Sequence, residues 1–153
     1  MSPVLLIEHS LRHGLDFTGR AGRAEYWWWI LFSLLMTSGL YFVGLTVPQL
    51  DWLANAWAVF SFVIGISLTV RRLHDIDMTG KWYLVVPGAI VITLVLASIA
   101  PDATSHILFV PVVLVMIFYF LVGFGPGEAG DNRFGSRHPV RPVPSSDIQT
   151  PNT

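Results

Sequence analysis

The sequence contains no cysteine and has few charged residues. Its 153 residues include nine Lys and Arg and ten Asp and Glu, so charged residues make up 12% of the chain, against about 25% in an average soluble domain. The absence of cysteine excludes disulfides, thiolate catalysis and cysteine-ligated metal sites. The net charge of −1 argues against a strongly basic nucleic-acid-binding protein, and we expect no nucleic-acid partner. Because 53% of the residues are hydrophobic, the composition favours an integral membrane protein.

Four long runs without Asp, Glu, Lys or Arg predict membrane-spanning helices. A helix rises about 1.5 Å per residue, so about 20 residues cross a hydrocarbon core about 30 Å thick. The runs are apolar on every side, whereas strands of a membrane barrel alternate apolar and polar residues. The predicted fold is therefore an all-α integral membrane protein. We expect four transmembrane helices, over about residues 26–48, 52–70, 82–101 and 107–125.

All nine basic residues fall on one side of this predicted topology. Three precede the first span, three lie between the second and third, and three follow the fourth, whereas the other two connections carry none. By the positive-inside rule, both termini and the middle loop lie in the cytoplasm of a multi-pass protein. Tryptophans at the start of the first and third spans are typical of anchors at the membrane interface. These anchors are Trp27, Trp28, Trp29 and Trp82.

The two ends of the chain differ from the spans. Ile7, Leu11 and Leu15 recur every four residues, which predicts a short interfacial helix before the first span. Prolines and serines dominate after residue 140, which predicts a disordered cytoplasmic tail over residues 141–153. Residues 1–140 are therefore expected to form a single four-span membrane domain.

Three polar stretches on the predicted cytoplasmic side carry recognisable motifs. The first is Phe-x-Gly-Arg-x-x-Arg-x-Glu-Tyr-Trp, formed by Phe17, Gly19, Arg20, Arg23, Glu25, Tyr26 and Trp27. The second is the Arg-Arg-Leu-His-Asp box, formed by Arg71, Arg72, Leu73, His74 and Asp75. The third is Gly-x-Asn-Arg-Phe-Gly, formed by Gly130, Asn132, Arg133, Phe134 and Gly135.

With these three motifs in this order, the chain resembles domain-of-unknown-function family 805 (DUF 805) of bacterial inner-membrane proteins. The resemblance covers about residues 17–140 and departs from the family at Gly80-Lys81-Trp82, where the family more often has Gly-Trp followed by another aromatic residue. It implies a four-span protein of the bacterial inner (plasma) membrane. It implies no activity.

The polar residues of the three stretches allow two interpretations. Charges near a membrane interface are costly unless they are paired, which favours an ion-pair network that ties the stretches together. Alternatively, the arginines converge on an anion, because guanidinium groups bind phosphate in a bidentate manner and the cytoplasmic leaflet is anionic. The candidate residues are Arg20, Arg23, Glu25, Arg71, Arg72, His74, Asp75, Asp77, Asn132 and Arg133.

Other chemistry has weaker support in the sequence. His74 and Asp75 are adjacent and point apart on a helix, so we expect no metal site, and no residue pattern indicates a nucleophile or a cofactor. Residues 125–130 match Gly-x-Gly-x-x-Gly but follow a span rather than a strand, which excludes a dinucleotide site. We therefore expect a non-enzymatic protein that binds or scaffolds anionic lipid headgroups or a protein partner, with homo-oligomerisation open. An oligomeric small channel or transporter, and then a lipid-modifying enzyme, are the alternatives.

Overall fold

The structure is a computed structural model and describes residues 2–99 and 104–135. The tail predicted over residues 141–153 lies outside this part of the chain. The helices are α1 (Pro3–Arg12), α2 (Arg23–Thr46), η1 (Pro48–Leu50), α3 (Trp52–Asp75), η2 (Gly80–Leu84), α4 (Val85–Ile99) and α5 (Thr104–Phe124). No strand is found in the described ranges, so the all-α prediction is confirmed.

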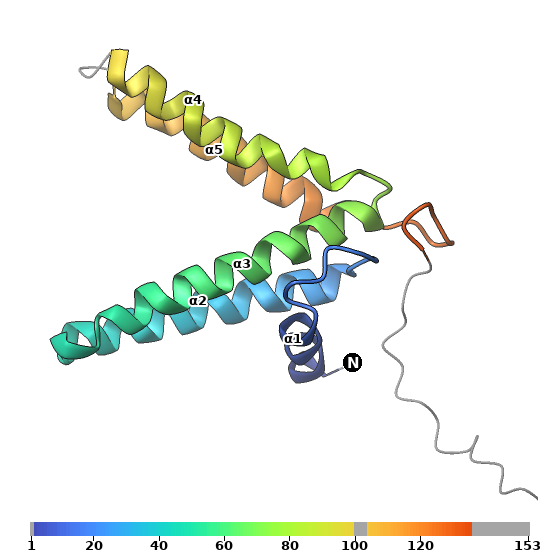
Figure 1. The fold of residues 1–153 in the computed structure, drawn as a ribbon, viewed down its shortest axis with the longest axis horizontal. Coiled ribbons are helices and arrows are strands. Elements are labelled where there is room, and N and C mark those ends of the chain that lie inside the picture. Colours follow the sequence, from blue (N-terminus) through green and yellow to red (C-terminus); the bar gives the residue numbers. More distant parts are fainter. Residues whose placement is uncertain (1, 100–103, 136–153) are drawn as a thin grey trace, which may run out of the picture.

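The helices form two hairpins arranged as a V (Figure 1). Helix α3 runs back along α2, and α5 runs back along α4, while α1 lies beside the α2–α3 hairpin. The hairpins meet at one end and diverge towards the other. We call the meeting end the apex; it contains the start of α2, the segment from Arg71 to Lys81, and the loop that follows α5.

Three segments are long and apolar enough to cross a membrane. They are Arg23–Thr46, Pro48–Asp75 and Gly80–Ile99, and a shorter apolar stretch covers Phe109–Phe124. Helix α3 continues five residues past the predicted end of the second span. Its last turn contains Arg72 and His74, and cations there are favoured by the negative end of the helix dipole.

The buried core lies near the apex, between α2 and α3. Tyr26, Trp29, Leu68 and Leu73 are almost fully buried there. Away from the apex, large apolar side chains of both hairpins are exposed, as expected for helices surrounded by lipid, where burial between helices gains no hydrophobic free energy. Trp29 was predicted to be an interface anchor, but its ring contacts Phe32 and Trp57 within the protein.

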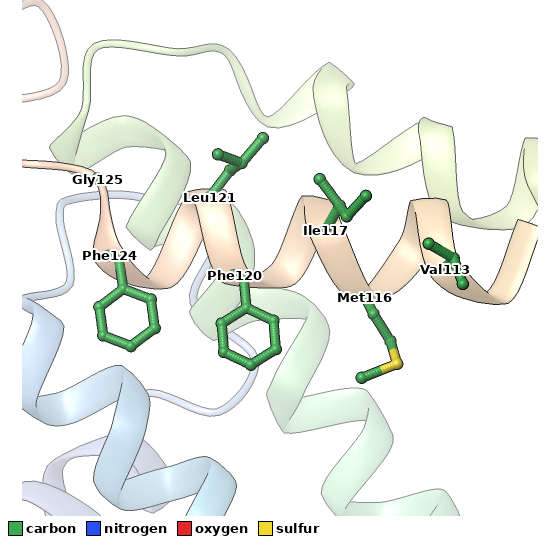
Figure 2. Close-up of a pocket in the computed structure, with 7 residues that line it drawn as sticks. All are labelled: Val113, Met116, Ile117, Phe120, Leu121, Phe124 and Gly125. Carbon is green, nitrogen blue, oxygen red and sulfur yellow. The ribbon is translucent and has the colours of Figure 1, made fainter.

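Helix α5 is apolar along its length, as a lipid-contacting helix should be. A pocket of about 720 Å³ on its surface is lined only by apolar side chains and Gly125. Figure 2 shows that Met116, Phe120 and Phe124 extend from one side of α5 and Ile117 and Leu121 from the other. The Trp27 ring packs against Phe120 and Phe124, so the aromatic side of α5 joins the two hairpins near the apex.

Helix α1 uses only part of the face that the sequence indicated. Ser2 caps its N-terminus by accepting a hydrogen bond from Leu5 N. Leu6 and Ser10 are buried, whereas Leu11 and Leu15 are exposed. The helix therefore docks on the α2–α3 hairpin through Leu6, Ser10 and the partly buried Ile7. Leu11, and Leu15 beyond the end of the helix, face outward.

Candidate functional site

The apex brings most of the sequence-predicted polar residues together around one carboxylate. Asp75, in the last turn of α3, is fully buried. Its Oδ1 lies 3.0 Å from Arg20 Nη2 and accepts a hydrogen bond of 3.1 Å from Arg20 Nε. Its Oδ2 pairs with Arg72 Nη1, from one turn earlier in the same helix. Both guanidinium groups are as inaccessible as the carboxylate between them.

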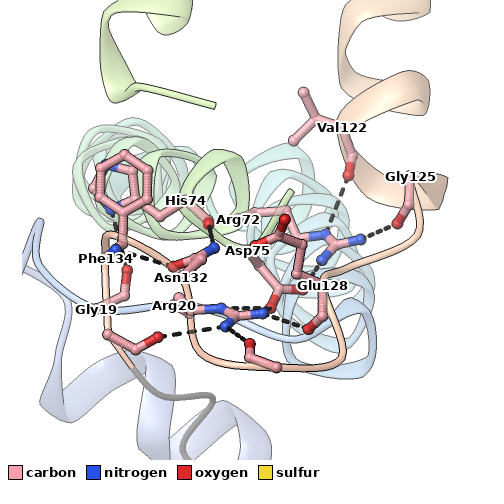
Figure 3. Close-up of polar contacts among 12 residues, drawn as sticks. Gly19, Arg20, Arg72, His74, Asp75, Val122, Gly125, Glu128, Asn132 and Phe134 are labelled. Carbon is pink, nitrogen blue, oxygen red and sulfur yellow. Dashed lines mark hydrogen bonds and ion pairs between the residues drawn. The ribbon is translucent and has the colours of Figure 1, made fainter. Parts of the chain in front are cut away.

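Backbone carbonyls at the end of α5 and in the loop after it occupy the remaining donors of these arginines (Figure 3). Arg72 Nε donates to Val122 O at 3.1 Å, and Arg72 Nη2 donates to Gly125 O. Arg20 Nη1 donates to Gly130 O at 2.6 Å, and Arg20 Nη2 donates to Glu128 O. Arg20 and Arg72 thus fasten the loop after α5, the exit loop, to α3. Hydrogen bonds from a charged donor are about twice as strong as those between neutral groups.

The local sequence explains how Arg20 reaches this position. Asp16 Oδ1 accepts hydrogen bonds from the Thr18 hydroxyl and backbone N–H, and these bonds lower the pKa of Asp16 below its ordinary value. Gly19 follows with φ +75°, a conformation that glycine adopts without steric cost. Ala21 N then donates to Arg71 O at 3.0 Å. The turn therefore directs Arg20 inward, under the end of α3.

A second buried cluster fastens α1 to α2 and α3. Arg71 Nη1 lies 3.3 Å from Glu25 Oε1, and His9 Nδ1 lies 3.0 Å from the same oxygen. The Ser10 hydroxyl is also within 3.2 Å of it. Arg71 keeps two buried groups, Nε and Nη2, that lack a hydrogen-bond partner within the described ranges. The sequence interpretation included Glu25 and Arg71 but missed His9 and Ser10, whose adjacent polar positions on the first helix were the available signal.

His74 contacts two loops, the one before α2 and the one after α5. Its Nδ1 lies 3.1 Å from Gly19 O, and its ring stacks on Phe134, with centroids 3.9 Å apart. Asn132 Nδ2 donates to His74 O at 2.8 Å, and Asn132 Oδ1 accepts from Phe134 N. Nothing in the described ranges gathers three metal-ligating His, Cys, Asp or Glu side chains. His74 thus joins the first and third motifs by packing.

Arg133, Asp77 and Arg23 lie outside the buried network. Arg133 Nε pairs with Asp77 Oδ1 at 3.0 Å, and both side chains are about half exposed. Arg23 is exposed at the first position of α2 and forms no ion pair within residues 2–99 and 104–135.

Exposure divides the described basic residues into two sets. Arg20, Arg71 and Arg72 are buried and ion-paired. Arg12, Arg23, Lys81 and Arg133 are exposed, with Arg12 paired to Glu8 and Arg133 to Asp77. We call Arg23 and Lys81, which form no ion pair in the described part of the chain, the free basic pair. Arg20 and Arg72 donate to Asp75 and to backbone carbonyls, and the unpartnered Nε and Nη2 of Arg71 are buried. The free basic pair, by contrast, is exposed to an external anion.

Of the predicted anchors, Trp28 and Trp82 are exposed. Trp27 is partly buried and its Nε1 donates to Gly123 O at 3.3 Å. Each exposed tryptophan is close in sequence to a member of the free basic pair, since Trp82 follows Lys81 and Trp28 lies five residues after Arg23. Basic and aromatic residues together are typical of headgroup depth.

Comparison with known proteins agrees with the motifs. A family model described as "Protein of unknown function (DUF805)" matches residues 14–136. Inner membrane protein YhaI of Escherichia coli K12 is 27% identical over 129 residues, which cover 82% of this chain and 88% of the relative. Uncharacterized protein YiiR of the same strain is 30% identical over 133 residues, 78% of this chain and 84% of the relative.

A further relative, Inner membrane protein YhaH of E. coli K12, is 32% identical over 82 residues. The match covers 48% of this chain and 65% of the relative. No solved structure matches the chain.

Proposed function

The chain belongs to the DUF805 family, and from this premise we propose that it is a non-enzymatic, four-span protein of the bacterial inner membrane that binds anionic lipid headgroups at its apex. Both termini then lie in the cytoplasm. The names of the relatives YhaI and YhaH support the membrane assignment. The presence of Arg20, Arg72 and Arg133 at the apex supports the orientation, because basic residues are enriched on the cytoplasmic side.

The observation that carries the binding proposal is the position of the free basic pair. Arg23 is the first residue of α2, and Gly22 before it has no side chain with which to cap the helix. Lys81 is exposed in the short helix η2 and forms no ion pair in the described part of the chain. At the start of α2, a cation at the positive end of the helix dipole is unfavourable by itself. An anion bound beside Arg23 would interact favourably with both the cation and the N-terminal backbone N–H groups of α2.

The anion that we propose is a phospholipid headgroup, because the basic residues lie near an anionic membrane surface. Each Lys or Arg near an anionic leaflet contributes about 1 kcal/mol of attraction. Trp28 and Trp82 are exposed, five residues after Arg23 and directly after Lys81 in the sequence, and exposed tryptophans are typical of headgroup depth. The buried network supports this role indirectly, because it ties the start of α2 to the end of α3 at the apex.

The test is lipid retention by the purified protein. We would extract the protein in mild detergent, add mixed phosphatidylglycerol and phosphatidylcholine, and count bound lipids by native mass spectrometry. The double variant Arg23→Gln/Lys81→Gln is expected to lose most of the preference for phosphatidylglycerol, with an unchanged melting temperature. Arg12→Gln is the matched control, because Arg12 is exposed but already paired with Glu8. Equal preference in all three proteins would overturn the proposal.

A further inference from the structure

We infer that the headgroup site at Arg23 is one half of a site for a whole anionic phospholipid, and that one acyl chain of this lipid lies in the pocket on α5. The inference rests on the proposed function for Arg23 and adds a second surface to that site. The pocket is the one in Figure 2, and we call it the acyl pocket. It is lined by Val113, Met116, Ile117, Phe120, Leu121, Phe124 and Gly125.

Trp27 connects the exposed cation to the acyl pocket. Arg23 and Trp27 have i, i+4 spacing in α2, so they share a face of the helix, with Cβ atoms about 5–6 Å apart. The Trp27 ring packs against Phe120 and Phe124, with centroid distances of 5.9 and 4.8 Å, and both phenylalanines line the acyl pocket. Trp27 Nε1 donates to Gly123 O at 3.3 Å, which holds the ring against α5. A headgroup at Arg23 therefore lies beside the end of the pocket at Phe124.

The acyl pocket runs away from the apex, as a lipid chain runs away from its headgroup. Phe124 is the last residue of α5, and Val113 lies about three turns earlier in the same helix. The lining therefore extends about 16 Å at 1.5 Å per residue. One leaflet provides about half of a hydrocarbon core about 30 Å thick, so the pocket is about as long as one leaflet is deep.

The surface of the acyl pocket suits a hydrocarbon chain. Its lining side chains are all apolar, so it offers no side-chain hydrogen bond or ion pair to a polar ligand. The rings of Phe120 and Phe124 are parallel within 7° and form a flat wall. Ile117, Phe120 and Phe124 are each about half exposed, so a chain can enter sideways from the bilayer without a movement of helices.

The same lining favours a lipid over a helix from a second copy of the chain. Helices that pack together in membranes bring small residues to their contact, because small side chains let the backbones approach closely. Among the described residues that line the acyl pocket, Gly125 alone is small, and it lies beyond the end of α5. The exposed guanidinium of Arg23 at the apex end complements a phosphate, which the lipid carries and an apolar helix does not.

Two isoleucines provide a filling variant and its control. Ile117 lines the acyl pocket and is 48% exposed, so Ile117→Trp places an indole where the chain would lie. Ile90 of α4 is 53% exposed and lines a different pocket. Ile90→Trp therefore adds the same bulk to the apolar surface outside the acyl pocket.

The experiment uses photolabelling of the full chain in phosphatidylcholine nanodiscs. One probe is a phosphatidylglycerol with a diazirine midway along one acyl chain, and the other is a phosphatidylcholine with the same labelled chain. Peptide mass spectrometry locates the labelled residues. We expect the phosphatidylglycerol probe to label residues 113–124 about fivefold more than the phosphatidylcholine probe, the factor that corresponds to about 1 kcal/mol for one arginine near an anionic headgroup.

The variants decide whether Arg23 and the acyl pocket act together. Arg23→Gln is expected to lower labelling by phosphatidylglycerol to the level of phosphatidylcholine, and Arg12→Gln to leave it unchanged, because Arg12 is already paired with Glu8. Ile117→Trp should reduce labelling of residues 113–124 by phosphatidylglycerol about fivefold, whereas Ile90→Trp should not. Unchanged labelling in Ile117→Trp or Arg23→Gln would overturn the inference, as would crosslinks that join two copies through α5.

The results also separate this inference from the proposed function. If native mass spectrometry shows a preference for phosphatidylglycerol that depends on Arg23 and Lys81, but both probes label residues 113–124 equally, headgroup binding stands and the acyl pocket is wrong. If neither measurement shows a preference for phosphatidylglycerol, the proposed function and this inference both fail.

Discussion

Gly127 lies directly against the carboxylate of Asp75. A Cβ built on Gly127 would overlap Asp75 Oδ2, and the next residue, Glu128, donates its backbone N–H to Asp75 O at 2.9 Å. Glycine is needed here because the exit loop must approach a buried ion pair closely. The Gly-rich segment after α5 therefore has a packing role, which is distinct from the nucleotide-binding role that its spacing superficially suggests.

Gly127→Ala is expected to destabilise the protein strongly. The added methyl group must displace the Asp75 carboxylate or the loop, and disturbing a buried ion pair costs about 3–5 kcal/mol. Thermal unfolding in detergent measures this change. Gly130→Ala is the matched control, because a Cβ there has nothing within 4 Å. A melting temperature for Gly127→Ala equal to that of Gly130→Ala would show that the close approach is unimportant.

The two aspartates of the second motif should differ sharply in their contribution to stability. Asp75→Asn leaves Arg20 and Arg72 buried without their shared counter-charge, so we expect a loss of about 3–5 kcal/mol. Asp77→Asn removes a half-exposed pair with Arg133, and such pairs contribute about 0–1 kcal/mol. Denaturation midpoints of the two variants test the difference. Similar losses in both would contradict the assignment of Asp75 as the centre of the network.

The positions of the helices were readable from the sequence, because length and hydropathy alone determine which runs cross a membrane. The pairing at the apex was only partly readable. Charge cost near the membrane predicted that the arginines would be paired, yet the backbone carbonyls that satisfy Arg20 and Arg72 leave no trace in side-chain identity. The sequence does not distinguish Trp29 from Trp27 and Trp28. Successive residues of a helix point in different directions, and only the orientation of α2 about its axis places the Trp29 ring in the core. Hydropathy also does not specify the packing of Trp27 against Phe120 and Phe124, which joins the two hairpins.

Glu25 should control the docking of α1. It is the common acceptor for His9, Ser10 and Arg71, so Glu25→Gln removes the charge that holds three elements together. We expect faster hydrogen exchange of the backbone N–H groups of residues 3–12, with smaller changes in α4 and α5. The control is Glu8→Gln, which removes an exposed pair with Arg12 that is worth about 0.3–0.5 kcal/mol. Unchanged exchange in Glu25→Gln would mean that Leu6 alone anchors the helix.

The orientation in the membrane can be tested cleanly because the native chain contains no cysteine. Gln49 is exposed in the turn between α2 and α3, and Ala129 is exposed in the loop after α5. If the basic apex faces the cytoplasm, Gln49→Cys should react with a membrane-impermeant maleimide in intact spheroplasts. Ala129→Cys should react only after lysis, because in intact spheroplasts the membrane keeps the reagent away from the cytoplasmic side.

Each single-cysteine variant serves as the control for the other, and the unmodified chain gives the background. Labelling of Ala129→Cys but not of Gln49→Cys in intact spheroplasts would reverse the orientation. That result would also place the free basic pair, Arg23 and Lys81, against the outer leaflet. Labelling of both positions before lysis would contradict an odd number of crossings between them, whereas Gln49 and Ala129 are separated by three helices, α3, α4 and α5. Three crossings require that the two cysteines lie on opposite sides of the membrane.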